Sequence, residues 1–311
     1  PLERVPIDTA LETGVSVLDG LITLGRGQRL GIFAGSGVGK STLLGSIARS
    51  SQADVNVIAL VGERGREVQE FIEKCLGPEG MARSVLVVAT SDASPLLRYK
   101  AAFTATAIAE WFRDQGKEVL FMADSVTRLA GAVREIGLAA GEPPTVKGYP
   151  PSFFSTMPRL VERLGRTQRG SITGILTVLV DADDMNEPVA DTMRGLLDGH
   201  CVLSRRIAAR GQFPAVDVLN STSRVMDAVV SDEHMASARM MRELMAVHEE
   251  ARDLVSVGAY RKGTDPEIDR AIAAQPAMLA LLKQGNRERR SMTDTIAALH
   301  AVTKIGAERK P

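Results

Sequence analysis

Cysteine and aromatic residues are scarce in this chain of 311 residues. There are two cysteines, Cys75 and Cys201, and aromatic residues make up 4% of the sequence. The two cysteines lie far apart with no metal-ligand spacing around them, which excludes a disulfide framework and favours buried thiols in a reducing compartment. A catalytic cysteine is not expected either, because no histidine lies at an informative spacing from Cys75 or Cys201.

An excess of either charge and a long apolar run are also missing. The 38 Lys and Arg residues balance 38 Asp and Glu residues, whereas proteins that bind a nucleic-acid backbone usually carry a basic excess. Nucleic acid is therefore not an expected partner. No apolar run approaches the ~18 residues of a membrane-spanning helix, and the first residues carry no signal-peptide core. We expect a cytoplasmic protein that contacts membranes only peripherally.

The most specific motif is a glycine-rich turn between a predicted strand and a predicted helix. Residues 34–41 read Ala-Gly-Ser-Gly-Val-Gly-Lys-Ser, which is the pattern of a P-loop. In this motif the backbone N–H groups face phosphates, Lys40 brings a positive charge and Ser41 provides a magnesium ligand. The common pattern has glycine where Ala34 stands, a difference that removes no phosphate ligand. We expect a nucleoside triphosphate to bind through the loop and the first helical turn, which comprise Gly35, Ser36, Gly37, Val38, Gly39, Lys40, Ser41 and Thr42.

Strand-like runs alternate with helical patterns from residue 29 to about residue 218, which is typical of a parallel sheet covered on both faces. The predicted strands are residues 29–34, 55–61, 85–90, 119–123 and 171–180. The predicted helices are residues 41–49, 66–75, 95–115 and 155–164. Residues 137–151 are rich in glycine and proline and are predicted to form a surface loop.

The C-terminal part of the sequence has a helical pattern. Met235 and Met241 belong to a set of residues that recur at three- and four-residue spacing, for which core packing is favoured over a docking groove. Asp265 can cap a further helix that begins at the following proline. We predict two domains, an α/β nucleotide-binding domain at residues 1–224 and a helical C-terminal domain at residues 225–311.

Two carboxylates follow predicted strands of the same sheet. Glu63 comes just after strand 55–61 and is the candidate base for a water that attacks a γ-phosphate, with Arg64 placed to meet the phosphoryl oxygens. Asp124 ends an apolar strand, as a carboxylate that supports Mg²⁺ does in P-loop enzymes. Alone, Glu63 could belong to a solvated charge run at a helix start, and Asp124 would be a weak signal because many buried strands end in Asp. Because ligands sit beyond the carboxyl ends of the strands in such sheets, we expect both to lie near the P-loop.

These segments resemble a known family over nearly the whole chain. The sequence is similar to the ATPases of type III protein export, the flagellar and virulence-secretion relatives of the rotary F-type ATP synthase β subunit. The resemblance rests on the P-loop and on residues 25–29, 62–68, 94–98, 124–128, 141–151, 183–188, 197–205 and 258–260. The Gly-Glu-Pro-Pro and Lys-Gly-Tyr-Pro-Pro runs within residues 141–151 resemble the export ATPases more than the synthase subunits.

The resemblance implies a fold and a ligand. The fold is α/β, a RecA-like P-loop NTPase core with a mostly parallel sheet, followed by a helical C-terminal domain. Relatives also carry an N-terminal β-barrel domain that helps to close a hexameric ring, and we expect this domain to be absent from the chain. The implied ligands are ATP and Mg²⁺, and the implied enzyme is a Mg²⁺-dependent protein-secreting ATPase.

The resemblance also implies residue roles. Lys40 and Ser41 would hold the β- and γ-phosphates and the metal, and Glu63 would activate water. Phe213 matches the aromatic residue that stacks on adenine. Arg224 matches the arginine finger that family members insert into the site of the neighbouring subunit.

The implied function is ATP hydrolysis coupled to protein export, with a flagellar system favoured over a virulence injectisome. We expect a homohexamer in the full-length protein, whereas this chain alone is expected to be monomeric and slow. Expected partners are the export apparatus, stalk and regulator proteins, export substrates and chaperones, at the inner face of a membrane-embedded export gate.

Two other classes of function remain as alternatives. A non-catalytic nucleotide-binding ring subunit characteristically lacks a carboxylate like Glu63. An RNA-driven ring helicase of related fold is disfavoured by the neutral charge balance and the few aromatic residues.

Overall fold

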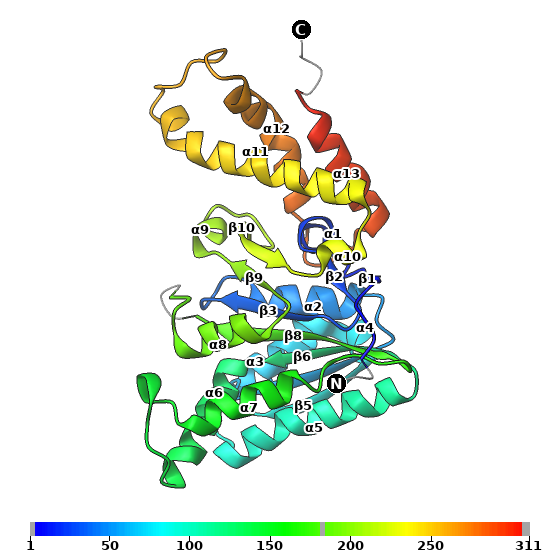
Figure 1. Ribbon diagram of the computed structural model, residues 1–311, viewed down its shortest axis with the longest axis vertical. Coiled ribbons are helices and arrows are strands. Elements are labelled where there is room, and N and C mark those ends of the chain that lie inside the picture. The colour runs from blue at the N-terminus through cyan, green and yellow to red at the C-terminus, as the bar shows by residue number, and fades with distance from the viewer. Residues whose placement is uncertain (1–3, 181–183, 307–311) are drawn as a thin grey trace.

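An eight-stranded sheet forms the centre of the molecule in the computed structural model, which describes residues 4–180 and 184–306 (Figure 1). The strand order is β10–β9–β3–β8–β6–β4–β5, with β7 beside β8. Neighbours from β9 to β5 pair in parallel, and β10 and β7 are antiparallel to their partners. The strands are β3 (Arg29–Ala34), β4 (Val55–Val61), β5 (Ser84–Ala89), β6 (Glu118–Asp124), β7 (Gly165–Arg166), β8 (Ser171–Leu179), β9 (Gly199–Leu203) and β10 (Val216–Ser223). A separate two-stranded ladder pairs β1 (Ala10–Leu11) with β2 (Leu24–Gly25).

The five predicted strands are confirmed as β3, β4, β5, β6 and β8, with their ends shifted by at most one residue. Their near-continuous apolar sequences follow from burial on both faces, as is usual for parallel strands. Strands β9 and β10 were not predicted. β9 is short and β10 carries polar residues on an edge of the sheet, so neither gives a strong apolar pattern.

Helices cover both faces of the sheet. The predicted helices correspond to α2 (Lys40–Ser50), α3 (Gly65–Glu70) with its π-helical continuation η1 (Phe71–Leu76), α5 (Pro95–Asp114) and α7 (Pro151–Val161). The start of α7 was predicted at residue 155, four residues late. The helix begins at Pro151, because a proline fits the first position of a helix. The predicted loop at 137–151 was also too long, since α6 (Val126–Ala139) runs into it. The remaining short helices are α1 (Ser16–Leu21), α4 (Gly77–Met81), η2 (Val146–Gly148), α8 (Pro188–Leu196) and α9 (Arg205–Ala209).

The sheet separates two hydrophobic cores. Successive residues of a strand point to opposite faces, so Ile32 packs in the core with α2 while Phe33 packs in the core with α5 to α8. The α2 core continues into the C-terminal helices, because it also contains Met241, Leu281 and Leu299. The part of the chain before β3 and the part after β10 therefore share one core with the sheet.

The C-terminal helices are α10 (Met226–Val229), α11 (Asp232–Ser256), α12 (Pro266–Leu282) and α13 (Met292–Lys304), and Figure 1 shows the last three above the sheet. The predicted cap is confirmed, since the Asp265 carboxylate accepts from the backbone N–H of Glu267 at 2.8 Å and of Ile268 at 3.2 Å. The structure thus has the expected fold class, whereas the domain boundary at 224/225 remains a prediction.

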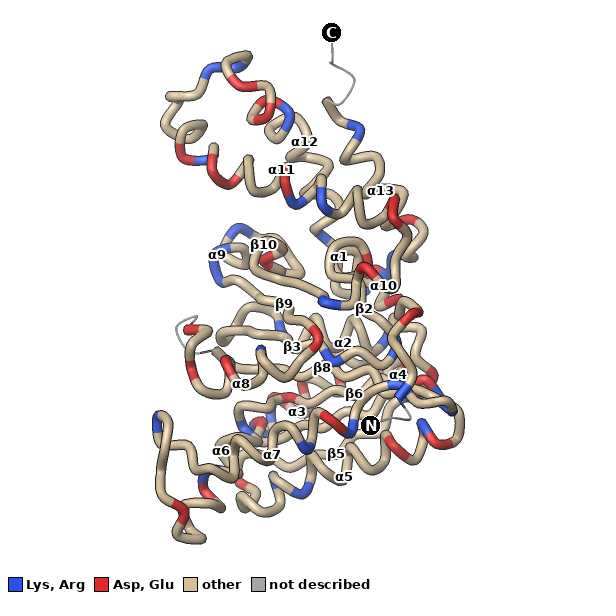
Figure 2. Tube along the Cα trace, viewed as in Figure 1, with Lys and Arg blue, Asp and Glu red and all other residues tan. Residues whose placement is uncertain are grey.

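Acidic and basic residues occur along both the sheet part and these helices (Figure 2). Within the described residues, no helix is long and apolar enough to span a bilayer.

Candidate nucleotide site

The P-loop lies between β3 and α2, as predicted. Gly37 and Gly39 have φ values of 77° and 90°, a backbone region that favours glycine, and Gly39 caps α2. A Cβ added to Gly37 would meet no atom within 4 Å, so this face of the loop is open. The first N–H groups of a helix lack intrahelical partners and attract anions. The loop and the start of α2 therefore form a phosphate cradle.

Three predicted side chains meet beside this cradle. Lys40, in the first turn of α2, forms an ion pair with Asp124 at the end of β6, and its Nζ lies 3.8 Å from Oε1 of Glu63. All three are nearly buried, with side-chain exposures of 12% for Lys40 and Glu63 and 5% for Asp124. Strands β4 and β6 are adjacent and paired in register, so the loop after β4 comes to the same edge as Asp124. The sequence-based expectation that these residues lie together is met.

Glu63 is the most perturbed group of this cluster. Burial and, less strongly, the negative charge of Asp124 raise the pKa of Glu63 to about 7, and Lys40 partly opposes this shift. Its buried Oε1 atom has no hydrogen-bond partner among the described residues. A carboxylate with a pKa near neutrality and an oxygen that accepts no hydrogen bond is suited to take a proton from a bound water.

Asp124 is held in place by a residue that the sequence analysis missed. The Thr177 hydroxyl on β8 donates a hydrogen bond of 2.6 Å to Oδ1 of Asp124, the oxygen that also pairs with Lys40. Thr177 lies on an apolar strand where threonine reads as an ordinary β-branched residue. Only the pairing of β6 with β8 reveals its contact.

The structure does not bring Arg64 into this cluster. Its side chain is 76% exposed and pairs with Glu67 on the next helical turn at 3.3 Å. In contrast, Arg205 lies against the P-loop, a contact for which no role was predicted although Arg205 belongs to the segment 197–205 that carries the family resemblance. A Cβ added to Gly35 would come within 2.8 Å of the Arg205 guanidinium, so this side chain lies directly against the loop.

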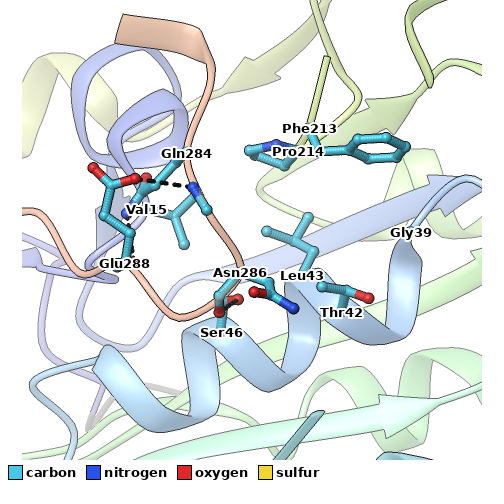
Figure 3. Close-up of a pocket in the computed structure, with 11 residues that line it drawn as sticks. Val15, Gly39, Thr42, Leu43, Ser46, Phe213, Pro214, Gln284, Asn286 and Glu288 are labelled. Carbon is cyan, nitrogen blue, oxygen red and sulfur yellow. Dashed lines mark hydrogen bonds between the residues drawn. The ribbon is translucent and has the colours of Figure 1, made fainter. Parts of the chain in front are cut away.

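A cavity of about 400 Å³ opens next to the cradle, between α2 and Phe213 (Figure 3). Phe213 is 47% exposed, and its ring would lie 3.5 Å from a Cβ built on Gly39. A flat base could therefore stack on Phe213 next to the phosphates. The far wall of the cavity is the segment Gln284–Glu288, which joins α12 to α13. This wall was not predicted, because the segment carries no motif and lies about 70 residues after Phe213.

Arg224 lies at the end of the sheet where the parallel strand β3 begins, whereas the P-loop lies where β3 ends. Its backbone N–H donates to the carbonyl of Asp198 at 2.9 Å, and Asp198 in turn pairs with Arg29 at the start of β3. A strand rises about 3.3 Å per residue, so the six residues of β3 place the P-loop about 20 Å away. The Arg224 side chain is exposed and donates to the carbonyl of Arg194 at 3.2 Å. It therefore has no access to the nucleotide site of its own chain.

The oxygen ligands at the site fit a magnesium ion that is shared with phosphates. Among residues 4–180 and 184–306, no cluster of three or more His, Cys, Asp and Glu side chains could hold a metal by itself. Magnesium needs one or two protein oxygens when substrate phosphates and water complete its shell. Ser41 is exposed on the first turn of α2, and Asp124 lies close to Lys40 of the same turn. These two residues supply such oxygens.

Two family models match consecutive parts of the chain. Residues 14–223 match the nucleotide-binding domain of the ATP synthase alpha/beta family, and residues 230–301 match the T3SS EscN ATPase C-terminal domain. The chain is 59% identical to the flagellum-specific ATP synthase of Bacillus subtilis, over 97% of this chain and 69% of that protein. It is 54% identical to the type 3 secretion system ATPase of Xanthomonas euvesicatoria, over the same shares of the two chains.

A solved structure has the same fold. The assembled ATPase EscN of enteropathogenic E. coli, in complex with its central stalk EscO, is 50% identical and superposes with a TM-score of 0.91 over 97% of this chain and 73% of that one. Because both the nucleotide-binding and the C-terminal segments match, the chain belongs to the ATP synthase alpha/beta family, in its branch of type III protein export ATPases.

Proposed function

We propose that this chain is a Mg²⁺-dependent ATPase that couples ATP hydrolysis to protein export through a type III secretion apparatus. The observation that carries the proposal is Glu63, a nearly buried carboxylate whose Oε1 atom lies 3.8 Å from Nζ of the P-loop lysine and has no hydrogen-bond partner among the described residues. A site that only binds nucleotide does not need a carboxylate that can take a proton from water. This distinguishes the proposal from a non-catalytic ring subunit.

The site residues divide the chemistry between them. Lys40 and the P-loop N–H groups bind the β- and γ-phosphates, and Ser41 and Asp124 would hold Mg²⁺. When bound, Mg²⁺ neutralises part of the phosphate charge. Glu63 orients a water and takes its proton, so that the water oxygen bonds to the γ-phosphorus as the bond to the β-phosphate oxygen breaks. The products are ADP and inorganic phosphate.

The position of Arg224 supports a ring in which each site is shared. Arg224 is exposed at the edge of the sheet opposite its own P-loop, where a neighbouring subunit can approach. The EscN structure named above is an assembled ATPase with a central stalk. We therefore propose a homohexameric ring with a stalk partner, located at the inner face of the export gate, that also meets regulators, chaperones and export substrates.

Two finer assignments belong to this proposal. The flagellar system is favoured because the B. subtilis relative has the higher identity, 59% against 54% for the Xanthomonas protein. The 54% sequence identity to the Xanthomonas type 3 secretion system ATPase keeps a virulence injectisome as the second candidate. We also retain residues 1–224 as the catalytic domain and residues 225–311 as the helical domain.

The direct test of the proposal is phosphate release from ATP. We expect turnover that requires Mg²⁺, stops when EDTA removes the metal and resumes when Mg²⁺ is restored. Lys40→Ala, which removes the charge at the phosphates, is the matched inactive control. Nucleotide binding without any phosphate release by a ring of the full-length protein would favour the non-catalytic subunit.

Phe213→Ala is expected to weaken nucleotide binding with little change in kcat. Stacking on an aromatic ring contributes about 1–3 kcal/mol per base, which corresponds to a rise in KM of about 5-fold to 150-fold. Phe213→Tyr keeps the ring and is expected to keep the KM within about twofold, because stacking needs the ring and not the hydroxyl. Steady-state kinetics at varied ATP concentration measure both values. An unchanged KM in Phe213→Ala would place the base elsewhere.

A further inference from the structure

The segment between α12 and α13 is fixed against the base cavity by hydrogen bonds. Gln284 is 9% exposed, and its backbone N–H donates to the carbonyl of Phe213 at 2.9 Å. Its side-chain amide donates to the carbonyls of Gly14 and Glu288 and accepts from the N–H and hydroxyl of Ser16. All four hydrogen-bonding positions of the amide are therefore used. Gln284 fixes the segment relative to the ring that stacks on the base.

The next part of the segment is fixed to α2. The backbone carbonyl of Asn286 accepts a hydrogen bond from the Ser46 hydroxyl at 2.9 Å and another from Arg49. The backbone N–H of Gly285 donates to the Glu288 carboxylate at 2.9 Å, so this acidic group is occupied as well. The backbone that carries the Asn286 side chain is thus preorganised.

Asn286 places a free amide at the end of the cavity away from the phosphates. Gly39 and Ser46 are seven residues apart on α2, so about 10 Å of helix separates the phosphate end from the Asn286 end. Figure 3 shows the Asn286 side chain beside Ser46, directed towards Leu43 under Phe213. Asn286 is exposed, and its side-chain amide makes no hydrogen bond within the described part of the chain, whereas its backbone carbonyl does. The polar side-chain groups of Gln284, Ser46 and Glu288 already make hydrogen bonds within the chain.

We propose that the Asn286 amide recognises the 6-amino edge of adenine, and the proposal rests on the proposed function of the site. A base that stacks on Phe213 with its sugar towards Gly39 turns its far edge to Asn286. The amide carbonyl accepts from the 6-amino group while the amide NH₂ donates to the adjacent ring nitrogen, a two-bond match between asparagine and adenine. Asn286 is thus a specificity-determining residue for the base.

The test compares two nucleotides that differ in the 6-amino group alone. The probes are the β,γ-imido triphosphates of adenosine and of purine riboside, with Mg²⁺, and their dissociation constants are measured by calorimetry. We expect the parent chain to bind the adenosine compound about tenfold more tightly, the effect of one well-made hydrogen bond. Asn286→Ala is expected to reduce this ratio to about one. Asn186→Ala, which removes an exposed amide before α8, is the matched control and keeps the ratio of the parent.

Each other result contradicts the inference. If the parent binds the two nucleotides equally, the edge is not recognised at all. If Asn286→Ala weakens both equally and keeps the tenfold ratio, Asn286 only supports the fold of the segment. In either case, hydrolysis of ATP by the parent leaves the proposed function standing, whereas a parent that binds neither nucleotide overturns both proposals.

Discussion

Glu63→Gln is expected to lower the turnover of ATP by a factor of about 10² or more, the usual contribution of a general base. The amide has the same shape as the carboxylate but cannot take a proton from water. Nucleotide affinity is expected to hold, because the change removes a negative charge next to Asp124 and leaves Lys40 in place. Phosphate release measures turnover, and calorimetry with a non-hydrolysable ATP analogue measures binding.

The pH dependence of the parent gives a second readout of the same carboxylate. Burial and the neighbouring Asp124 raise the pKa of Glu63 to about 7, and only the ionised form can act as a base. Below this pKa the group is protonated, so kcat/KM is expected to fall about tenfold for each pH unit of acidification, and above it to level off. The residual activity of Glu63→Gln should lack this transition.

Glu70→Gln is the matched control for Glu63→Gln. Glu70 lies at the end of α3, seven residues after Glu63, where its side chain is 40% exposed and pairs with Arg66 and Lys74. Losing this carboxylate is expected to change turnover by less than about twofold, since exposed ion pairs contribute little. Our assignment of the base is wrong if Glu63→Gln hydrolyses ATP as fast as Glu70→Gln.

Arg224→Ala is expected to cost a factor of about 10³ in the turnover of the assembled ring, the lower range for an arginine finger supplied by a neighbour. Binding of nucleotide by the isolated chain should not change, because Arg224 lies at the opposite edge of the sheet from the P-loop. The comparison requires full-length rings whose assembly is verified by sedimentation. Arg239→Ala, which removes an exposed arginine on α11, is the control for charge alone.

Mixed rings show which subunit Arg224 serves. Subunits with Arg224→Ala keep Glu63, and subunits with Glu63→Gln keep Arg224. A complete site forms where the Arg224 of a Glu63→Gln subunit reaches the Glu63 of a neighbouring Arg224→Ala subunit. A mixture of two nearly inactive proteins is therefore expected to regain activity. A mixture that stays inactive, with rings that assemble normally, would mean that Arg224 acts elsewhere than in a neighbour's site.

Much of the phosphate end of the site was predictable from the sequence. Lys40 and Ser41 belong to a motif, and Glu63 and Asp124 each follow a strand with a strong apolar pattern. Parallel strands bring such positions to one edge of the sheet, so local patterns were sufficient to group them. The structure confirms that Lys40, Glu63 and Asp124 lie together, whereas it leaves Arg64 exposed beside Glu67.

The sequence by itself determined five strands of the sheet, the P-loop and the carboxylates, because these depend on residues that are close in the chain or on a repeated strand pattern. Only the tertiary structure decided that Thr177 holds Asp124, that residues 284–288 close the base cavity and that Arg224 faces away from its own site. Each of these contacts joins segments from 26 to about 270 residues apart. Such contacts depend on strand order and on the packing of the last helices against the first, which no local pattern records.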